Sequence, residues 1–119
     1  MTPQQARAIA ASLLDAVDVT QGERLCFDVG GKGFAWGYLR REQKNKPRVL
    51  QPEVLAIACS IERKEMLIEA AADIYFDDDH YRGYPAVLVR LAVVGEAELR
   101  ALLEDALRMK AGRKSSRHS

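Results

Sequence analysis

The sequence predicts a two-layer α+β sandwich, in which helices cover one face of an antiparallel sheet. Three observations support this prediction. Hydrophobic residues repeat with helical spacing near both ends of the chain. Several short apolar runs between these segments are typical of strands. A glycine-rich segment, residues 30–33, separates two of these runs and indicates a hairpin, which makes neighbouring strands antiparallel.

The composition is that of one soluble globular domain. The chain has 119 residues, of which 48% are hydrophobic and 29% are charged, and this length buries roughly two-thirds of the surface of the unfolded chain. We expect a single domain over residues 1–111 and a flexible basic tail over residues 112–119. No apolar run reaches the roughly 20 residues of a membrane span, and the first residues do not resemble a secretory signal. We therefore expect a cytoplasmic protein with no membrane partner.

The first predicted element is a helix from about Pro3 to Ala16. Thr2 is a favourable N-cap, and proline is favourable at the first helical position. Apolar residues then follow a helical stripe, which predicts one buried face. Residues 24–29 and 34–39 are the two strands of the hairpin.

Alternation in the second hairpin strand places Phe34, Trp36 and Tyr38 on one face. Gly37 lies in the middle of this strand and suggests a bulge or a close approach by another backbone. Whether Trp36 is exposed cannot be read from the alternation alone. A core position is the simpler interpretation.

The second half of the chain predicts two helices and three strands. The run at residues 54–61 is apolar throughout, which favours a central strand over a strand that leads into a helix. In the next helix, Leu67, Ile68 and Ala71 face inward, and charged residues, Lys64 among them, face water. With the first half included, the predicted order of elements along the whole chain is α-β(3)-α-β(2)-α. The elements of this half are a strand at 54–61, a helix at 62–72, strands at 73–77 and 86–92, and a helix from Gly95 to Gly112.

Positive charge is concentrated in two segments, although the formal net charge is only +1. Residues 40–48 hold five basic residues against one acidic residue, Glu42. Residues 110–119 hold four basic residues and no acidic residue. A near-neutral total argues against a dedicated high-affinity DNA-binding protein, but the clusters leave room for a local anion-binding patch.

Two segments carry a resemblance to a known family. They are F-D-V-G-G-K-G-F-A at residues 27–35 and H-Y-R-G-Y-P-A-V-L-V-R-L at residues 80–91. With the closing E-L-R-A-L-L-E-D-A, they make residues 3–110 similar to the MmcQ/YjbR family of small bacterial proteins. The resemblance implies the α-β(3)-α-β(2)-α fold, similar to secretion chaperones and often compared with frataxin-like proteins. It also implies a double-wing motif with a DNA-binding label, and it implies no enzymatic activity.

We hypothesise that the chain binds nucleic acid, such as DNA, without sequence preference through a basic wing. Lysine and arginine on such a loop neutralise phosphates, and Trp36 and Tyr38 would stack on bases if exposed. A solvated loop beside core aromatic residues is the simpler interpretation of the same pattern. The alternative function is a protein-interaction or chaperone-like module that forms a homodimer or a complex. The candidate nucleic-acid-binding residues are Lys32, Arg40, Arg41, Lys44, Lys46 and Arg48.

Other chemistry finds little support. The acidic run at residues 77–79 and His80 resemble a cation site, but neighbouring side chains of an extended segment diverge, so a solvated acidic turn is favoured over a metal-dependent enzyme. Cys26 and Cys59 are expected to be reduced, buried thiols rather than a disulfide. Arg90 lies in an apolar strand, so it should reach the open face of the sheet or, as we prefer, pair with an acid such as Asp28. We expect no catalytic residues, no metal and no cofactor.

Overall fold

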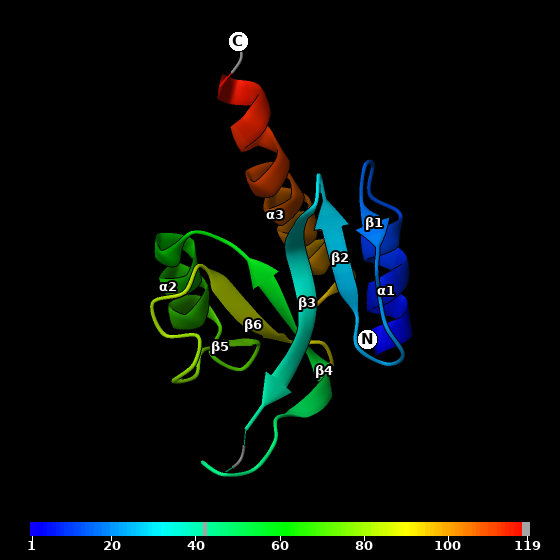
Figure 1. Cartoon of the computed structure of the whole chain (residues 1–119). Helices are drawn as coiled ribbons and strands as arrows, with labels where there is room; N and C mark the ends of the chain where they lie inside the picture. Colours follow the sequence, from blue (N-terminus) through cyan, green and yellow to red (C-terminus); the bar gives the residue numbers. More distant parts are fainter. Residues whose placement is uncertain (42, 118–119) are drawn as a thin grey trace.

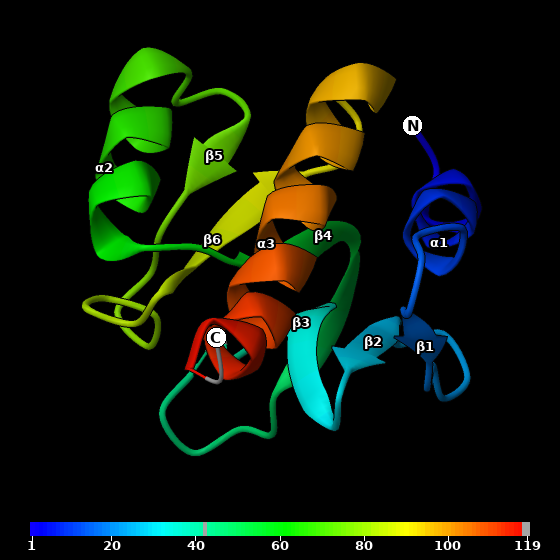
Figure 2. The same ribbon diagram turned by 90° about the horizontal axis from the view of Figure 1, so that it is seen from above.

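The computed structural model describes residues 1–41 and 43–117, with side chains described up to residue 112. It has the predicted α+β architecture, with helices packed on a six-stranded sheet of order β1-β2-β3-β4-β6-β5. Each neighbouring pair of strands is antiparallel. Helix α3 lies between α1 and α2 in both ribbon views (Figures 1 and 2). The sheet therefore has one face covered by helices.

Helix α1 (Pro3–Ala11) begins where the sequence predicts. Thr2 and Gln5 form a reciprocal cap at its N-terminus. The Thr2 hydroxyl oxygen accepts a hydrogen bond from the Gln5 backbone N–H at 3.1 Å, and the Thr2 N–H donates to Gln5 Oε1 at 2.8 Å. These bonds satisfy donors that the first turn of a helix leaves without partners.

The chain leaves the helix at Ser12, so the predicted extension to Ala16 is wrong. The Ser12 hydroxyl donates to the Ile9 carbonyl at 2.7 Å, a local bond that competes with the helical pattern. Asp15 then adopts a positive φ of 72°, which a right-handed helix excludes. The next residues form a short strand that was not predicted, β1 (Val17–Asp18), which pairs with β2.

Strands β2 (Cys26–Val29) and β3 (Lys32–Arg40) form the predicted hairpin. Gly30 and Gly31 alone make the turn, with φ of 57° and 80°. Glycine adopts this left-handed conformation without a steric penalty, and two-residue hairpin turns require it. The turn is therefore shorter than the predicted residues 30–33, because β3 already begins at residue 32.

A β-bulge changes the predicted face of Phe34. The register of β2 with β3 shifts between Phe27 and Asp28, so that Phe34 has no partner in the ladder. Its ring turns toward the helices, with its centroid 6.4 Å from that of Phe27. Trp36 and Tyr38 stay on the opposite face, so the prediction that all three aromatic residues share one face is wrong for Phe34.

Strand β4 (Val49–Ala58) lies at the centre of the sheet beside β3, and its other neighbour is β6 (Ala86–Arg90). Residues 55–58 are buried, as predicted for a central strand. Strand β4 starts five residues earlier than the sequence suggests. Its register with β3 omits residues 52–54, and this bulge accommodates Pro52, which has no N–H to donate to a ladder.

Gly37 lies where another segment approaches β3, as predicted. A Cβ atom at this position would lie 2.9 Å from Arg24 Cγ and 3.2 Å from Leu50 Cδ1. The register shift between β3 and β4 occurs directly after Gly37. The predicted bulge is therefore present, and the closest approach is made by two side chains rather than by another backbone.

Helix α2 (Ile61–Ala70), strand β5 (Tyr75–Phe76) and helix α3 (Glu96–Arg117) complete the fold. The predicted end of the last helix at Gly112 is wrong, because α3 continues through it; one interior glycine costs only about 1 kcal/mol relative to alanine. The predicted mobility of the tail, with side chains 113–119, lies outside the described residues. In the part of the chain that is described, no helix combines the length and apolar character needed to cross a membrane.

The sheet buries a separate hydrophobic cluster on each face. The covered core lies between the sheet and the three helices. The second cluster lies on the opposite face, which we call the open face. Large residues of the covered core include Phe27, Ile57, Tyr75, Leu99 and Leu103. The open-face cluster consists of Tyr38, Ala56, Tyr81, Ala86 and Leu88, with Trp36, Val54 and Phe76 packed against it.

The two cysteines are free thiols, as predicted. Cys59 is buried after β4, as predicted, whereas Cys26 is only half-buried in β2, so the prediction of burial is wrong for Cys26. Burial raises the pKa of both thiols. They therefore remain protonated near neutral pH, where a thiol is a poor nucleophile.

Candidate functional site

The basic wing, residues 40–48, projects beyond the sheet where β3 ends and β4 begins (Figure 1). Its described side chains are exposed. The Arg41 guanidinium donates to the Lys44 carbonyl at 3.4 Å, and the Lys46 N–H donates to the Gln43 carbonyl at 3.1 Å. These bonds close the end of the wing without using the ammonium groups of its lysines.

The wing and the loop of residues 77–85 enclose a pocket of about 310 Å³. The wing contributes Arg40, Arg41 and Arg48, and the loop contributes Asp78, Asp79 and His80. Tyr38 and Leu39 of β3 complete the lining. The structure thus brings three of the six predicted binding residues into one pocket.

The other three predicted residues lie elsewhere. Lys44 and Lys46 are on the same wing but do not line this pocket. Lys32 is at the opposite end of β3 from Arg40, and the nine residues of this strand span roughly 26 Å at about 3.3 Å per residue. Lys32 is therefore too far away to contact a ligand in the pocket.

Arg48 and His80 face one another across the mouth of the pocket. Arg48 Nη1 lies 3.4 Å from His80 Nε2, and Arg48 Nη2 lies 3.4 Å from His80 Nδ1. Two such distances place the guanidinium alongside the imidazole ring. The Tyr81 and His80 rings pack edge to face, with centroids 5.3 Å apart. This arrangement joins the wing to the open-face cluster.

The acidic side of the pocket makes internal bonds, so the prediction of a solvated acidic turn holds only in part. Asp78 accepts hydrogen bonds from the Tyr38 hydroxyl and, at 2.7 Å, from the Tyr81 N–H. Burial and the bond to Asp78 raise the pKa of the Tyr38 phenol. The exposed Asp79 forms an ion pair with Arg82 at 2.8 Å. Among the described residues, no group of three or more His, Cys, Asp or Glu side chains is placed to hold a metal ion.

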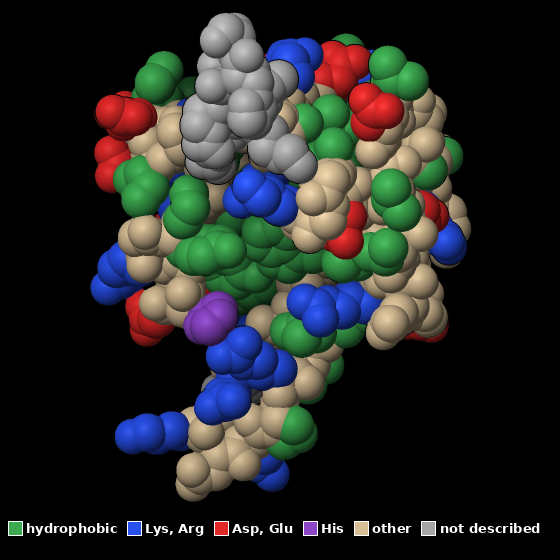
Figure 3. Space-filling model, turned by 45° about the horizontal axis from the view of Figure 1, so that its top comes forward, with side chains coloured by type: hydrophobic (Ala, Val, Ile, Leu, Met, Phe, Trp, Pro, Cys, Tyr) green, Lys and Arg blue, Asp and Glu red, His purple; other side chains and the backbone are tan. Residues whose placement is uncertain are grey.

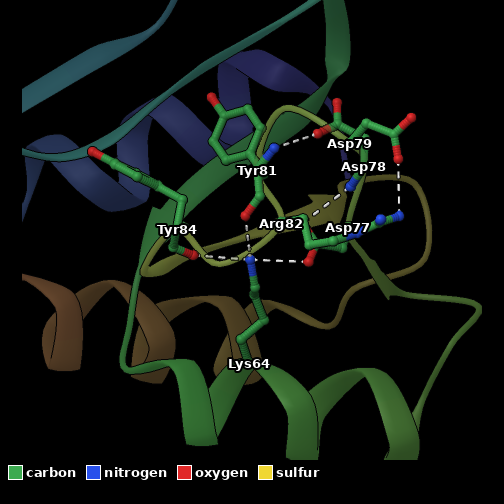
Figure 4. Close-up of polar contacts among 7 residues, drawn as sticks. All are labelled: Lys64, Asp77, Asp78, Asp79, Tyr81, Arg82 and Tyr84. Atoms are coloured by element: carbon green, nitrogen blue, oxygen red, sulfur yellow. Dashed lines mark hydrogen bonds and ion pairs between the residues drawn. The ribbon is translucent and has the colours of Figure 1, made fainter.

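A buried lysine, which the sequence analysis placed in water, fixes the loop of residues 77–85. The Lys64 side chain is only 3% exposed. Its ammonium donates to the carbonyls of Tyr81 at 2.7 Å and Tyr84 at 2.8 Å, and it pairs with Asp77 at 3.0 Å (Figure 4). We call this group the lysine latch. The signal was present in the sequence, because position 64 continues the inward stripe of residues 67, 68 and 71 on α2.

The latch holds two tyrosine rings on the side of the loop away from α2 (Figure 4). The Tyr81 hydroxyl accepts a hydrogen bond from Trp36 Nε1 at 2.9 Å. The Tyr84 ring meets Trp36 and Tyr81 edge to face, at centroid distances of 6.4 and 5.8 Å. Trp36 is half-buried, whereas Tyr84 is 48% exposed. Tyr84, rather than Trp36, is thus the outermost ring.

Hydrophobic side chains gather in the middle of the face seen in Figure 3, with Lys and Arg side chains around them and a histidine at the edge. Arg24 Nε donates to the Gly37 carbonyl of β3 at 3.3 Å. Among the described residues, Arg90 forms no ion pair with Asp28 or another acid, so the preferred pairing is wrong. The alternative, that Arg90 reaches the open face, is correct. The Arg90 guanidinium lies 4.1 Å from the centroid of the Phe76 ring and donates to the Ala72 carbonyl at 3.2 Å.

Comparison with known proteins identifies the fold. The family model of YjbR matches residues 11–109. Among solved structures, the crystal structure of Deinococcus radiodurans protein DR2400, with family-model domain DUF419, is similar with a TM-score of 0.64. The two sequences are 22% identical, and the similarity covers 93% of this chain and 80% of that chain. No curated protein matches.

Proposed function

We propose that this chain, which belongs to the YjbR family, binds nucleic acid without sequence preference and contacts phosphate through the basic wing. With this function we propose a cytoplasmic location in a bacterial cell, where nucleic acid is accessible. The proposal assigns no reaction and no cofactor to the chain.

One observation carries the proposal: Arg40 and Arg41 from one arm of the wing and Arg48 from the other line a single pocket. Among the described residues, no acidic side chain forms an ion pair with these arginines or with Lys44 and Lys46. Guanidinium groups bind phosphate oxygens in a bidentate manner. A phosphate would therefore meet donors that no described carboxylate already occupies.

Asp78 and Asp79, the two acidic residues of the pocket, oppose the binding of a phosphate by the wing arginines less than their charge suggests. Asp78 already accepts two hydrogen bonds, and Asp79 is paired with Arg82. We therefore expect the phosphate to lie on the side of the wing, and Lys44 and Lys46 to contact neighbouring phosphates of the same strand. Sequence-independent affinity follows, because phosphates are the same at every position.

The test is binding of labelled single-stranded and duplex oligonucleotides of mixed sequence, measured by fluorescence anisotropy over a salt series. The logarithm of the affinity should fall linearly with the logarithm of salt concentration, by about 0.7–0.9 per phosphate contact. Replacing Arg40, Arg41, Lys44 and Lys46 by alanine should abolish binding. Absence of binding at low salt, or binding that this variant retains, would contradict the proposal.

Position can be separated from net charge with a matched pair of single variants. Arg48→Ala and Lys32→Ala each remove one exposed positive charge. Arg48 lies beside the Arg40 end of β3, and Lys32 lies at the other end of this strand. If the wing is the site, Arg48→Ala should weaken binding several-fold and lower the salt slope, whereas Lys32→Ala should change either little. Equal effects would show attraction by overall charge and no site at the wing.

The second candidate function is a protein-interaction module. The observation that favours it is the hydrophobic open face, where Tyr84 is half-exposed. Sedimentation analysis separates the two functions, because the interaction module predicts a homodimer or a stable complex with a protein partner.

A further inference from the structure

We propose that the nucleic acid bound by this protein is single-stranded, and that a base stacks on the Tyr84 ring of the open face while the wing holds the backbone. This inference rests on the proposed function and deepens it. It assigns a role to an aromatic surface that phosphate binding alone leaves unused.

The first argument is that the aromatic surface and the phosphate pocket are continuous. His80 lines the pocket and packs against Tyr81, whose ring in turn packs against Tyr84 at 5.8 Å. Tyr38 belongs to both the pocket lining and the open-face cluster. A short strand whose phosphate meets Arg48 can thus extend along this surface and place one of its bases on Tyr84.

The second argument is that the exposed ring is held in place before any ligand binds. The Tyr84 carbonyl accepts from Lys64, and the Tyr84 N–H donates to the Tyr81 carbonyl at 2.9 Å. The edge contact with Trp36 restrains the ring itself. A ring fixed in this way loses little conformational entropy when a base stacks on it.

The third argument is charge. Arg48 lies on one side of the aromatic surface, and Arg24 is hydrogen-bonded to the strand that carries Trp36. Proteins that bind single strands without sequence preference combine a positively charged surface for the backbone with aromatic rings for the bases. An apolar protein partner would use the aromatic rings but has no need of the cations around them.

Base stacking also selects the strandedness of the ligand. In a duplex the base faces are stacked on each other, so that Tyr84 has no base to contact. In a single strand they are free. Duplex DNA would therefore bind through the wing alone, and a single strand would gain an additional contact.

The experiment compares three probes of the same length, about 12 nucleotides, which is within the usual site size. They are an oligothymidylate, a deoxyribose-phosphate oligomer without bases, and a duplex. Affinity is measured by anisotropy at fixed salt. The fluorescence of Trp36, the only tryptophan in the chain, gives a second readout, because a base stacked on the adjacent Tyr84 changes its environment.

We expect the oligothymidylate to bind about tenfold more tightly than the oligomer without bases, and to quench Trp36 fluorescence. Tyr84→Ala should remove this tenfold difference and leave binding of the oligomer without bases unchanged. Tyr84→Phe is the matched variant, since it keeps the ring and should keep the difference. Circular dichroism verifies that both variants are folded.

Three results would overturn the inference, and each has a different consequence for the proposed function. Equal affinity for all three probes removes the stacking contact but retains phosphate binding. Binding of no probe at low salt overturns both proposals. A homodimer that Tyr84→Ala dissociates assigns the open face to a second copy of the chain instead of a base.

Discussion

The two faces of the sheet are closed by different kinds of interaction. On the covered face, three helices bury apolar side chains such as Phe27, and little hydrogen bonding between side chains is required. On the open face, Tyr81 of the loop of residues 77–85 packs against Tyr38 of β3, and both hydroxyls are hydrogen-bonded. A buried ammonium fixes the loop backbone. The covered face derives its stability from buried area. The open face depends on particular bonds that orient exposed rings.

This difference teaches that stability and orientation are separable in this fold. Loss of apolar area should lower the free energy of unfolding without altering the open face. Loss of a specific bond should disturb the loop before it unfolds the chain. The variants below test this separation, beginning with the largest expected effect.

Phe27→Ala should cause the largest loss of stability. Its side chain is fully buried in the covered core, and removing a buried Phe side chain costs about 3–5 kcal/mol, partly through the cavity that remains. Tyr84→Ala on the open face should cost less, about 1–2 kcal/mol, the value of its two aromatic contacts. Urea unfolding of both variants measures the contrast. Similar losses would mean that the open face contributes to stability as the core does.

Lys64→Met should lower the free energy of unfolding by about 2–3 kcal/mol, because two buried carbonyls and Asp77 lose their partner. Hydrogen exchange should accelerate in residues 77–85 more than in the covered core. Glu65→Met is the matched control, since residue 65 is exposed on the same helix and should change stability by less than about 0.5 kcal/mol. A Lys64→Met variant that is as stable as the control would show that the bonds of the lysine latch do not stabilise the fold.

Tyr75→Phe and Tyr38→Phe test one bond on each face, and each should cost about 1 kcal/mol. Tyr75 donates to Glu98 in the covered core, and Tyr38 donates to Asp78 on the open face. Burial, followed by the bond to a carboxylate, raises the pKa of both phenols in the folded state.

The pH dependence of these two bonds follows from the direction of the shifts. Since each folded-state pKa lies above the unfolded value near 10, the stabilisation is fully present below about pH 10 and is lost as the pH rises further. The advantage of the wild type over each Phe variant should therefore shrink in alkaline urea titrations. A stability advantage of the wild type that grows with pH would contradict the raised pKa of the phenols.

Asp105→Asn should have the smallest effect, about 0.5–1 kcal/mol at neutral pH, because the carboxylate is partly exposed. Asp105 accepts from Arg63 of α2 and Arg108 of α3, and the bond from Arg63 is the main cause of its lowered pKa. A lowered folded-state pKa stabilises the fold above the ordinary value of 3.8, and this contribution disappears as the pH falls through the folded-state value. Acid urea titrations of the wild type and the variant should converge.

The class of fold and the hairpin were predictable, because they follow from local patterns. Alternation of apolar and other residues predicted strand β2, and the glycines after it predicted a turn, in which Gly30 and Gly31 have positive φ. The face of Phe34 was not predictable, because a bulge inverts the alternation and depends on which residues the partner strand offers. The start of β4 was missed for a similar reason: Pro52 argues against a strand, and only the register with β3 shows that it lies in a bulge.

Half of the candidate site was predictable. The basic residues of the wing are close together in the sequence, so their clustering needs no knowledge of the fold. Their counterpart, His80, is 32 residues from Arg48 in the sequence, and only the sheet brings the two loops together. Lys64 was assigned to solvent because lysine is rarely buried. Its position on the apolar stripe of α2 was the better guide.

The outermost strands of the sheet, β1 and β5, are two residues long. A short edge exposes few backbone groups, so an unfolded segment or another copy of the chain finds little template for pairing. The long central strands, whose unpaired backbone groups would bind another strand if exposed, are paired with a neighbouring strand on both sides. The chain is thereby protected against the edge-to-edge growth that leads to fibres, while its open face stays available.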